Sequence, residues 1–114
     1  MGDSGMALFG APVSIGTHAR AAVMAAFKAQ EALKKLTERR IKRGAKPLYV
    51  GIGINTGETV AGCVGTHERM EYSVIGHAVN LASRLEEIAR PGQILLGPET
   101  ASLLDQRFIL RKKE

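Results

Sequence analysis

The sequence predicts an α+β fold, in which helices pack on a sheet that contains antiparallel hairpins. Two long segments repeat apolar residues at helical spacing, whereas several short segments alternate apolar residues with small or polar ones. Turn residues separate the short segments closely enough for hairpins. A chain of 114 residues, 45% of them hydrophobic, is enough for one domain and too short for two ordinary ones. The expected order of elements is β, α, β, β, β, α, β, α, β.

The first third of the chain predicts a strand followed by a long helix. The apolar run "MALF", residues 6–9, is a short strand that Gly10 and Pro12 end. The helix begins near Thr17, a favourable capping residue, and stops near Gly44. Its apolar residues recur at spacings of four and three, which predicts packing on a sheet; they are Ala22, Ala26, Ala29, Leu33 and Leu36.

The next segment, "LYVGIGINTGETVAGCVG", predicts a β-hairpin with its turn at residues 55–58. Before the turn, Gly51 and Gly53 alternate with bulky residues, and glycine in a strand indicates close approach by another backbone, a helix or a ligand. No lysine followed by serine or threonine comes after these glycines. The segment also does not lead from a strand into a helix, which argues against a phosphate-binding or dinucleotide-binding loop.

The rest of the chain predicts three strands and two helices. A strand over residues 70–75 leads into a helix over residues 77–89, which "RPG" ends. "QILLG" is another strand, "PETASLL" a short helix that opens on Pro98, and "RFILRK" a last strand. The helix over residues 77–89 has an apolar side that we expect to be buried, formed by Ala78, Leu81, Ala82, Leu85 and Ile88.

The distribution of charge is compatible with nucleic acid as a partner, because the net charge is +5 and the cations cluster within residues 28–46 and 111–113. Against this, the chain has no Trp, two Tyr and three Phe, so it lacks a set of aromatic residues for stacking on single strands. We therefore interpret the basic cluster as a solvated helix face and expect no nucleic-acid partner.

The sequence carries no address for export. No apolar run approaches the ~20 residues that span a bilayer, and the first residues lack the basic segment of a signal peptide. The single cysteine, Cys63, cannot form an internal disulfide and is expected to be a buried thiol. These features predict a cytoplasmic domain, which a longer protein could attach to a membrane through other parts.

Two polar residues of the helix over residues 77–89, Asn80 and Arg84, are four positions apart and therefore share a face. Ser73 lies near the end of the preceding strand. The guanidinium group offers a fork of donors suited to phosphate oxygens, and the amide both donates and accepts hydrogen bonds. The spacing alone is compatible with a ligand site and with plain solvent-facing polar groups.

Three segments in order resemble the catalytic domain of the class III nucleotidyl cyclases, the adenylyl and guanylyl cyclase family. They are "GDSGMALFGAP", "VGIGINTGETVAGCVG" and "RMEYSVIGHAVNLASRLEEIARPGQILLGPET", and together they extend over nearly the whole chain. The resemblance implies that residues 1–114 are the C-terminal portion of a single catalytic domain with a ferredoxin-like, antiparallel-rich sheet. It also implies a homodimer whose active sites lie in the interface and draw residues from both protomers.

The resemblance gives four residues an expected role. Asp3 matches the second of two aspartates that hold two Mg²⁺ or Mn²⁺ ions. Arg84 matches an arginine that stabilises charge on the α-phosphate, and Asn80 an asparagine that orients the ribose. Ser73 matches the position that reads the base, where a hydroxyl resembles the threonine of adenylyl cyclases. The implied reaction is attack of the ribose 3′-hydroxyl on the α-phosphate, which converts ATP, with GTP as the alternative substrate, to the cyclic nucleotide and pyrophosphate.

The chain departs from the family pattern in several places. No strand with the first metal aspartate and no base-reading lysine precede Asp3, and Tyr49 and His77 replace an arginine and an aspartate that many members carry. We therefore expect the sheet to lack the family's N-terminal central strand, the chain alone to be inactive, and its exposed sheet edge to associate. A non-catalytic regulatory module of the same family and a basic nucleic-acid-binding domain are the alternatives.

Overall fold

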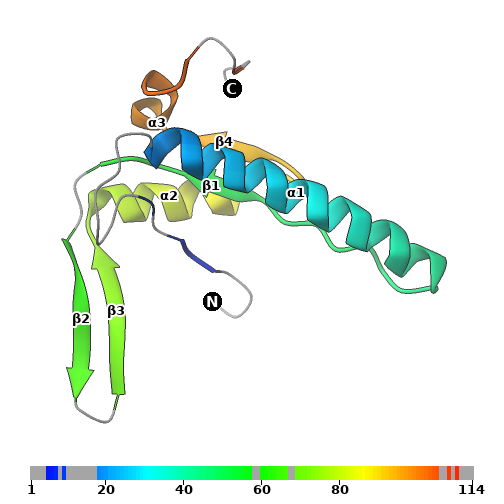
Figure 1. Ribbon diagram of the computed structural model, residues 1–114, viewed down its shortest axis with the longest axis horizontal. Helices are drawn as coiled ribbons and strands as arrows, with labels where there is room; N and C mark the ends of the chain where they lie inside the picture. Colours follow the sequence, from blue (N-terminus) through cyan, green and yellow to red (C-terminus); the bar gives the residue numbers. More distant parts are fainter. Residues whose placement is uncertain are drawn as a thin grey trace.

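The computed structural model describes residues 5–7, 9, 18–57, 60–66, 69–105, 108 and 110. Figure 1 shows α1 crossing in front of β1 and β4, α2 against β1 on the other side, and β2 and β3 extending away as a ribbon. The elements in chain order are α1 (His18–Lys42), β1 (Ile52–Ile54), β2 (Val60–Thr66), β3 (Arg69–Ile75), α2 (His77–Ile88), β4 (Ile94–Leu96) and α3 (Pro98–Ser102).

The strands form two separate pairs. β1 pairs with β4 in parallel, with Ile52 opposite Ile94, and β2 pairs with β3 in antiparallel, with Val60 opposite Ile75. The hairpin predicted around residues 55–58 is therefore wrong, because β1 takes a partner from 40 residues further along the chain. A short, continuous apolar run such as residues 94–96 suits a parallel strand between helices, and no local pattern announces that pairing.

The long helix agrees with its prediction at its C-terminal end. Arg43 and Gly44 form a turn after α1, and Gly44 adopts φ 80°, the left-handed region that glycine enters without steric cost. The proposed cap, Thr17, lies outside the described residues.

The predicted buried stripe of α1 is only partly right. Ala26 is buried, but Ala29 and Leu36 are exposed. The covered face instead follows the spacing of Ala19, Val23, Ala26, Gln30, Leu33 and Thr37, of which Thr37 is buried with 6% exposure. Gln30 and Thr37 belong to this face because their side chains hydrogen-bond to backbone groups of Leu48 and Val50, after the helix. A pattern of apolar residues does not predict such polar members.

Side chains of α1 hold the extended segment before β1 through its backbone. The Thr37 hydroxyl donates to Leu48 O at 2.8 Å and accepts from Leu48 N at 3.1 Å. The Gln30 amide donates to Val50 O at 2.8 Å, and Arg40 Nε donates to Lys46 O at 2.8 Å. These bonds fix the approach of the chain to β1.

The glycines of β1 and its preceding residue face α2, as their spacing in the strand predicted. A Cβ on Gly53 would stand 2.6 Å from Ala82 O and 2.7 Å from Leu85 Cβ, and one on Gly51 would stand 2.8 Å from Ala89 Cβ. The close-approach prediction is therefore confirmed, with a helix as the neighbour.

The second helix runs as predicted, and its apolar side is only half-covered. Ala78, Leu81, Ala82 and Leu85 are partly buried, whereas Ile88 remains 58% exposed near the end of the helix. The expectation that Ile88 is buried is therefore wrong for this chain. α3 opens on Pro98 as predicted.

Two predicted terminal strands are not confirmed. Residues 5–7 and 9 have no regular structure, and no described ladder joins them to β1–β4. The segment 107–112 lies mostly outside the described residues, and Phe108 and Leu110 within it are not in a strand. The expected burial of the Cys63 thiol also lies outside the described side chains. The α+β class itself is confirmed.

Candidate functional site

The candidate site is the exposed side of α2. Gly76 separates β3 from α2 with φ 150° and ψ 169°, a conformation that side chains other than hydrogen make unfavourable. The helix then starts, and Asn80 N donates to Gly76 O at 3.2 Å as its first α-helical bond. At the other end Ala89 is extended, and the proline at position 91 disfavours a helical residue 90, so the helix does not continue.

Asn80 and Arg84 lie on the side of α2 that faces away from β1. Ala82 and Leu85 contact Gly53, whereas Asn80 and Arg84 are exposed. A spacing of four places the two polar side chains one turn apart on the same face, as the sequence predicted. Within the part of the chain that the structure describes, neither side chain has a hydrogen bond or ion pair, so both are available to bind a ligand.

Ser73 and Asp3 are the other two residues singled out from the sequence. Ser73 lies in β3 in register with Gly62 of β2, and β3 leads through Gly76 directly into α2. The structure thus places its backbone near the start of the helix that carries Asn80, while its side chain is outside the described set. Asp3 lies outside the described residues, so the prediction that it binds metal stays untested.

The described residues do not form a metal site by themselves. No group of three or more His, Cys, Asp or Glu side chains among residues 5–7, 9, 18–57, 60–66, 69–105, 108 and 110 could hold an ion. α2 instead presents an amide and a guanidinium group, which are donors for anions. Both groups are chemically suited to hydrogen-bond an anion such as phosphate.

A second group of polar residues lies after the carboxyl ends of β1 and β4; the sequence predicted Asn55 and Thr56 only as part of a turn and Thr100 as part of a short helix. Asn55 Nδ2 donates to Ala78 O of α2 at 3.0 Å. The Thr56 and Thr100 hydroxyls are hydrogen-bonded at 2.7 Å, and Thr100 is fully buried. The partners of Asn55 and Thr56 lie 23 and 44 residues further along the chain, so no local pattern predicted these bonds.

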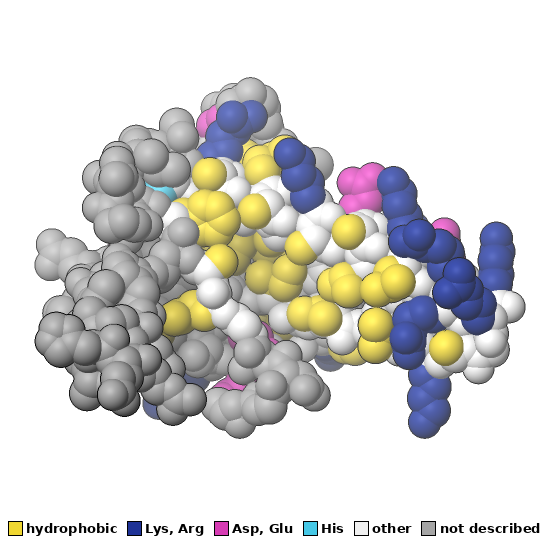
Figure 2. Space-filling model, turned by 60° about the horizontal axis from the view of Figure 1, so that its bottom comes forward, with side chains coloured by type: hydrophobic (Ala, Val, Ile, Leu, Met, Phe, Trp, Pro, Cys, Tyr) yellow, Lys and Arg dark blue, Asp and Glu magenta, His cyan; other side chains and the backbone are white. Residues whose placement is uncertain are grey.

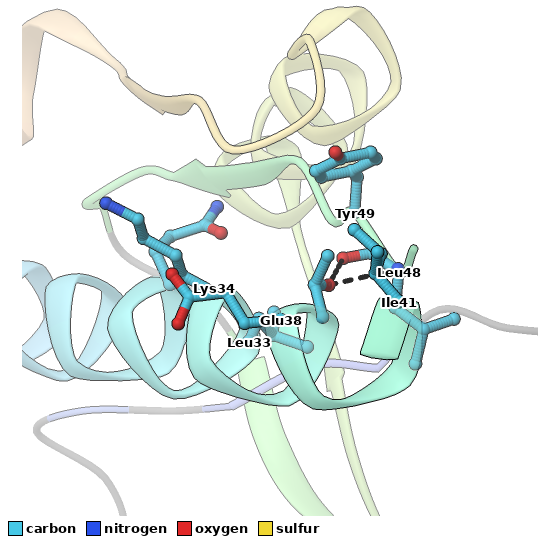
Figure 3. A pocket seen from close by; sticks show the side chains of 8 residues that line it. Leu33, Lys34, Glu38, Ile41, Leu48 and Tyr49 are labelled. Atoms are coloured by element: carbon cyan, nitrogen blue, oxygen red, sulfur yellow. Dashed lines mark hydrogen bonds between the residues drawn. The ribbon is translucent and has the colours of Figure 1, made fainter. Parts of the chain in front are cut away.

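Two residues that depart from the family pattern, His77 and Tyr49, lie in different parts of the structure. His77 is exposed at the first position of α2. Tyr49 is 62% exposed and lines an open groove beside α1, which Figure 3 shows together with the Thr37–Leu48 bonds. Apolar and polar side chains both line this groove, and they include Leu33, Lys34, Glu38, Ile41 and Leu48.

The basic cluster lies away from α2. Figure 2 shows Lys and Arg side chains gathered around the end of the molecule where α1 finishes. The exposed members include Lys34, Lys35, Arg39, Lys42 and Arg43. Their position agrees with the interpretation of a solvated helix end. No described helix is long and apolar enough to cross a membrane.

Comparison with known proteins gives consistent relatives. The family model for the adenylate and guanylate cyclase catalytic domain matches residues 1–114. An uncharacterised protein of Mycobacterium tuberculosis is 39% identical over 101 residues, 87% of this chain and 16% of that protein. Adenylate cyclase 1 of Rhizobium meliloti is 39% identical over 85 residues, 75% of this chain and 13% of that protein. The chain therefore spans less than a fifth of either relative.

Solved structures show the same likeness. The guanylyl cyclase Cya2 matches with TM-score 0.84 and 38% identity over 91% of this chain and 53% of that chain. The adenylyl cyclase CyaB from P. aeruginosa matches with TM-score 0.77 and 42% identity over 83% and 50% of the two chains. The guanylate cyclase domain of RhGC from Catenaria anguillulae, in complex with GTP, has TM-score 0.78 and 28% identity over 89% and 53%. This chain thus spans about half of each solved structure.

Proposed function

Since the chain belongs to the family of adenylate and guanylate cyclase catalytic domains, we propose that α2 supplies the phosphate-facing half of a nucleotide-cyclising site. The observation that supports this most directly is the placement of Asn80 and Arg84, one turn apart, exposed and without a partner among the described residues. In this proposal residues 1–114 form the C-terminal portion of a single catalytic domain.

Arg84 has the chemistry for the α-phosphate. Cyclisation adds negative charge to the non-bridging oxygens while the 3′-oxygen attacks and pyrophosphate leaves. A guanidinium group can give two parallel hydrogen bonds to such oxygens. Stabilisation of developing charge is usually the largest contribution of a site of this kind.

Asn80 and Ser73 provide orientation in the same proposal. Asn80, one turn earlier on α2, is placed to hydrogen-bond the ribose through its amide, and Ser73 is expected beside the purine. The substrate preference rests on Ser73 alone, and a hydroxyl can both donate and accept. The relatives include adenylyl and guanylyl cyclases, so we propose ATP as the substrate with GTP as the alternative.

The complete site needs more than this face. We propose a homodimer in which Asn80 and Arg84 of one protomer face the metal-binding side of the other. Mg²⁺ or Mn²⁺, which would neutralise triphosphate charge, would be held by Asp3 and by the family's first metal aspartate, whose position precedes residue 1.

A complementation assay tests the proposal. Cyclic AMP and cyclic GMP are measured with Mn²⁺ for the 114-residue chain alone and for its mixture with a relative's cyclase domain whose matching arginine is replaced by alanine. We expect no product from either component and cyclic AMP from the mixture, because Arg84 completes the composite site.

The controls separate the alternatives. The variant Arg84→Ala in this chain should remove the activity of the mixture without preventing association, which sedimentation can verify. Cyclic nucleotide formation by the chain alone would contradict the expectation that the chain is inactive by itself. Association without turnover would favour the non-catalytic regulatory module instead.

A further inference from the structure

Asn55 connects the end of β1 to the first turn of α2. Its Nδ2 group donates to Ala78 O at 3.0 Å, a bond between residues 23 apart in the chain. Ala78 is two residues before Asn80. The helix has no side-chain cap at Gly76, so this bond is a direct side-chain link between β1 and the start of α2.

The other atom of the same amide is packed tightly. Asn55 Oδ1 is buried and has no hydrogen-bond partner in the described part of the chain. Gly97 lies directly against it, because a Cβ on Gly97 would overlap Asn55 Oδ1. Gly97 is itself held to β1 by donation from its N–H to Ile54 O at 2.8 Å. The amide is therefore clamped between the first turn of α2 and the residue that precedes α3.

A directional bond matters here because β1 and the residue before it present glycines to α2. Gly51 and Gly53 present bare backbone to Ala82, Leu85 and Ala89. Side chains that interlock across an interface resist sliding and rotation, whereas glycine offers none. Packing on β1 therefore determines the distance between α2 and β1. It constrains less strongly the rotation of α2 about its own axis and its register along β1.

We propose that Asn55 is a positioning residue for the cyclising site, because its bond to Ala78 fixes the rotation and register of α2 and hence the directions of Asn80 and Arg84. This inference rests on the proposed function for its catalytic consequence. Asn55 touches neither the ribose nor the phosphate in this arrangement. Misplacement of catalytic groups by about 1 Å can lower a rate roughly 100-fold, so a loose α2 would lower turnover more than binding.

Two variants and one control isolate this role. Asn55→Ala removes the amide, and Asn55→Leu removes the donor while keeping the branching and the number of side-chain heavy atoms. Thr56→Val is the matched control, since it breaks the neighbouring bond to Thr100 without touching α2. Tm is measured for all three, so that effects on turnover can be compared at known stability.

The first measurement is kinetic, in the complemented mixture described above. We expect kcat to fall about 10-fold to 100-fold for both Asn55 variants, with a nearly unchanged KM for ATP and unchanged kcat in Thr56→Val. Equal kcat in all variants, or losses that follow Tm alike at Asn55 and Thr56, would overturn the proposal.

The second measurement does not need activity. Hydrogen exchange reports the protection of backbone amides in residues 78–84, and we expect faster exchange in both Asn55 variants and not in Thr56→Val. If the wild-type mixture makes no product, the proposed function fails while this measurement still tests Asn55. Unchanged exchange in the Asn55 variants would exclude the positioning role.

Discussion

Gly53 and Ala82 lie in direct backbone contact, since a Cβ on Gly53 would stand 2.6 Å from the Ala82 carbonyl oxygen. Neither partner is the flexible end of a side chain, so the strand and the helix could accept that Cβ only by moving apart.

Gly53→Ala is therefore expected to lower the free energy of unfolding by about 1–3 kcal/mol, the usual range for overpacking in a close contact. Urea denaturation followed by circular dichroism measures the change. Gly5→Ala is the control, because nothing lies within 4 Å of a Cβ at that position. A Gly53→Ala variant as stable as Gly5→Ala would contradict the contact between β1 and α2.

Thr37→Val tests the attachment of the segment before β1. The substitution keeps the shape of the buried side chain but removes a hydroxyl that bonds both the N–H and the carbonyl oxygen of Leu48. We expect a loss of about 1–3 kcal/mol, because two backbone groups lose their partner. Thermal denaturation measures it, with the exposed Ser102→Ala, which removes a local bond to Glu99 O, as the milder comparison.

Gly76→Ala addresses the junction between β3 and α2. At φ 150° an L side chain is strained, and the expected loss of stability is about 1–3 kcal/mol. The exposed Ser83→Ala in the middle of the same helix should change stability by less than about 0.5 kcal/mol. Equal unfolding midpoints for the two variants would show that α2 can begin without glycine.

Arg84→Ala should separate function from stability. Because the side chain is exposed, its loss should change the free energy of unfolding by no more than about 0.5 kcal/mol. Turnover in the complemented mixture should nevertheless fall about 100-fold to 1,000-fold, the range for removing a donor to developing charge. Glu87→Gln, exposed on the same helix, is the control, and retained turnover in Arg84→Ala would refute the role of the guanidinium group.

Local signals predicted most helix positions and failed on strand partners. Gly44 and Pro98 mark the ends of elements in the structure, as predicted, since backbone restrictions act on the residue itself. The predicted partner of β1 was wrong, because the choice between the near β2 and the distant β4 depends on packing between helices. Likewise Gln30 and Thr37 lie on the covered face of α1 because they form hydrogen bonds there, and a pattern of apolar residues does not predict them.

The candidate site divides in the same way. The shared exposed face of Asn80 and Arg84 follows from a spacing of four in a helix and was predictable. The link from Asn55 to Ala78 joins residues 23 apart and has no periodic signal. A prediction from spacing can therefore identify which groups share a face, whereas the groups that hold this face in place become visible only in three dimensions.

The attachment of residues 46–50 to α1 also bears on solubility. Leu48 N–H and O, together with Val50 O, already have partners on α1, so this extended stretch offers few free backbone groups to another molecule. Unpaired extended backbone is the usual template for edge-to-edge aggregation. The helix thus shields the apolar run Leu48–Tyr49–Val50, each residue of which is at least 40% exposed, from being extended by a strand of a neighbouring chain.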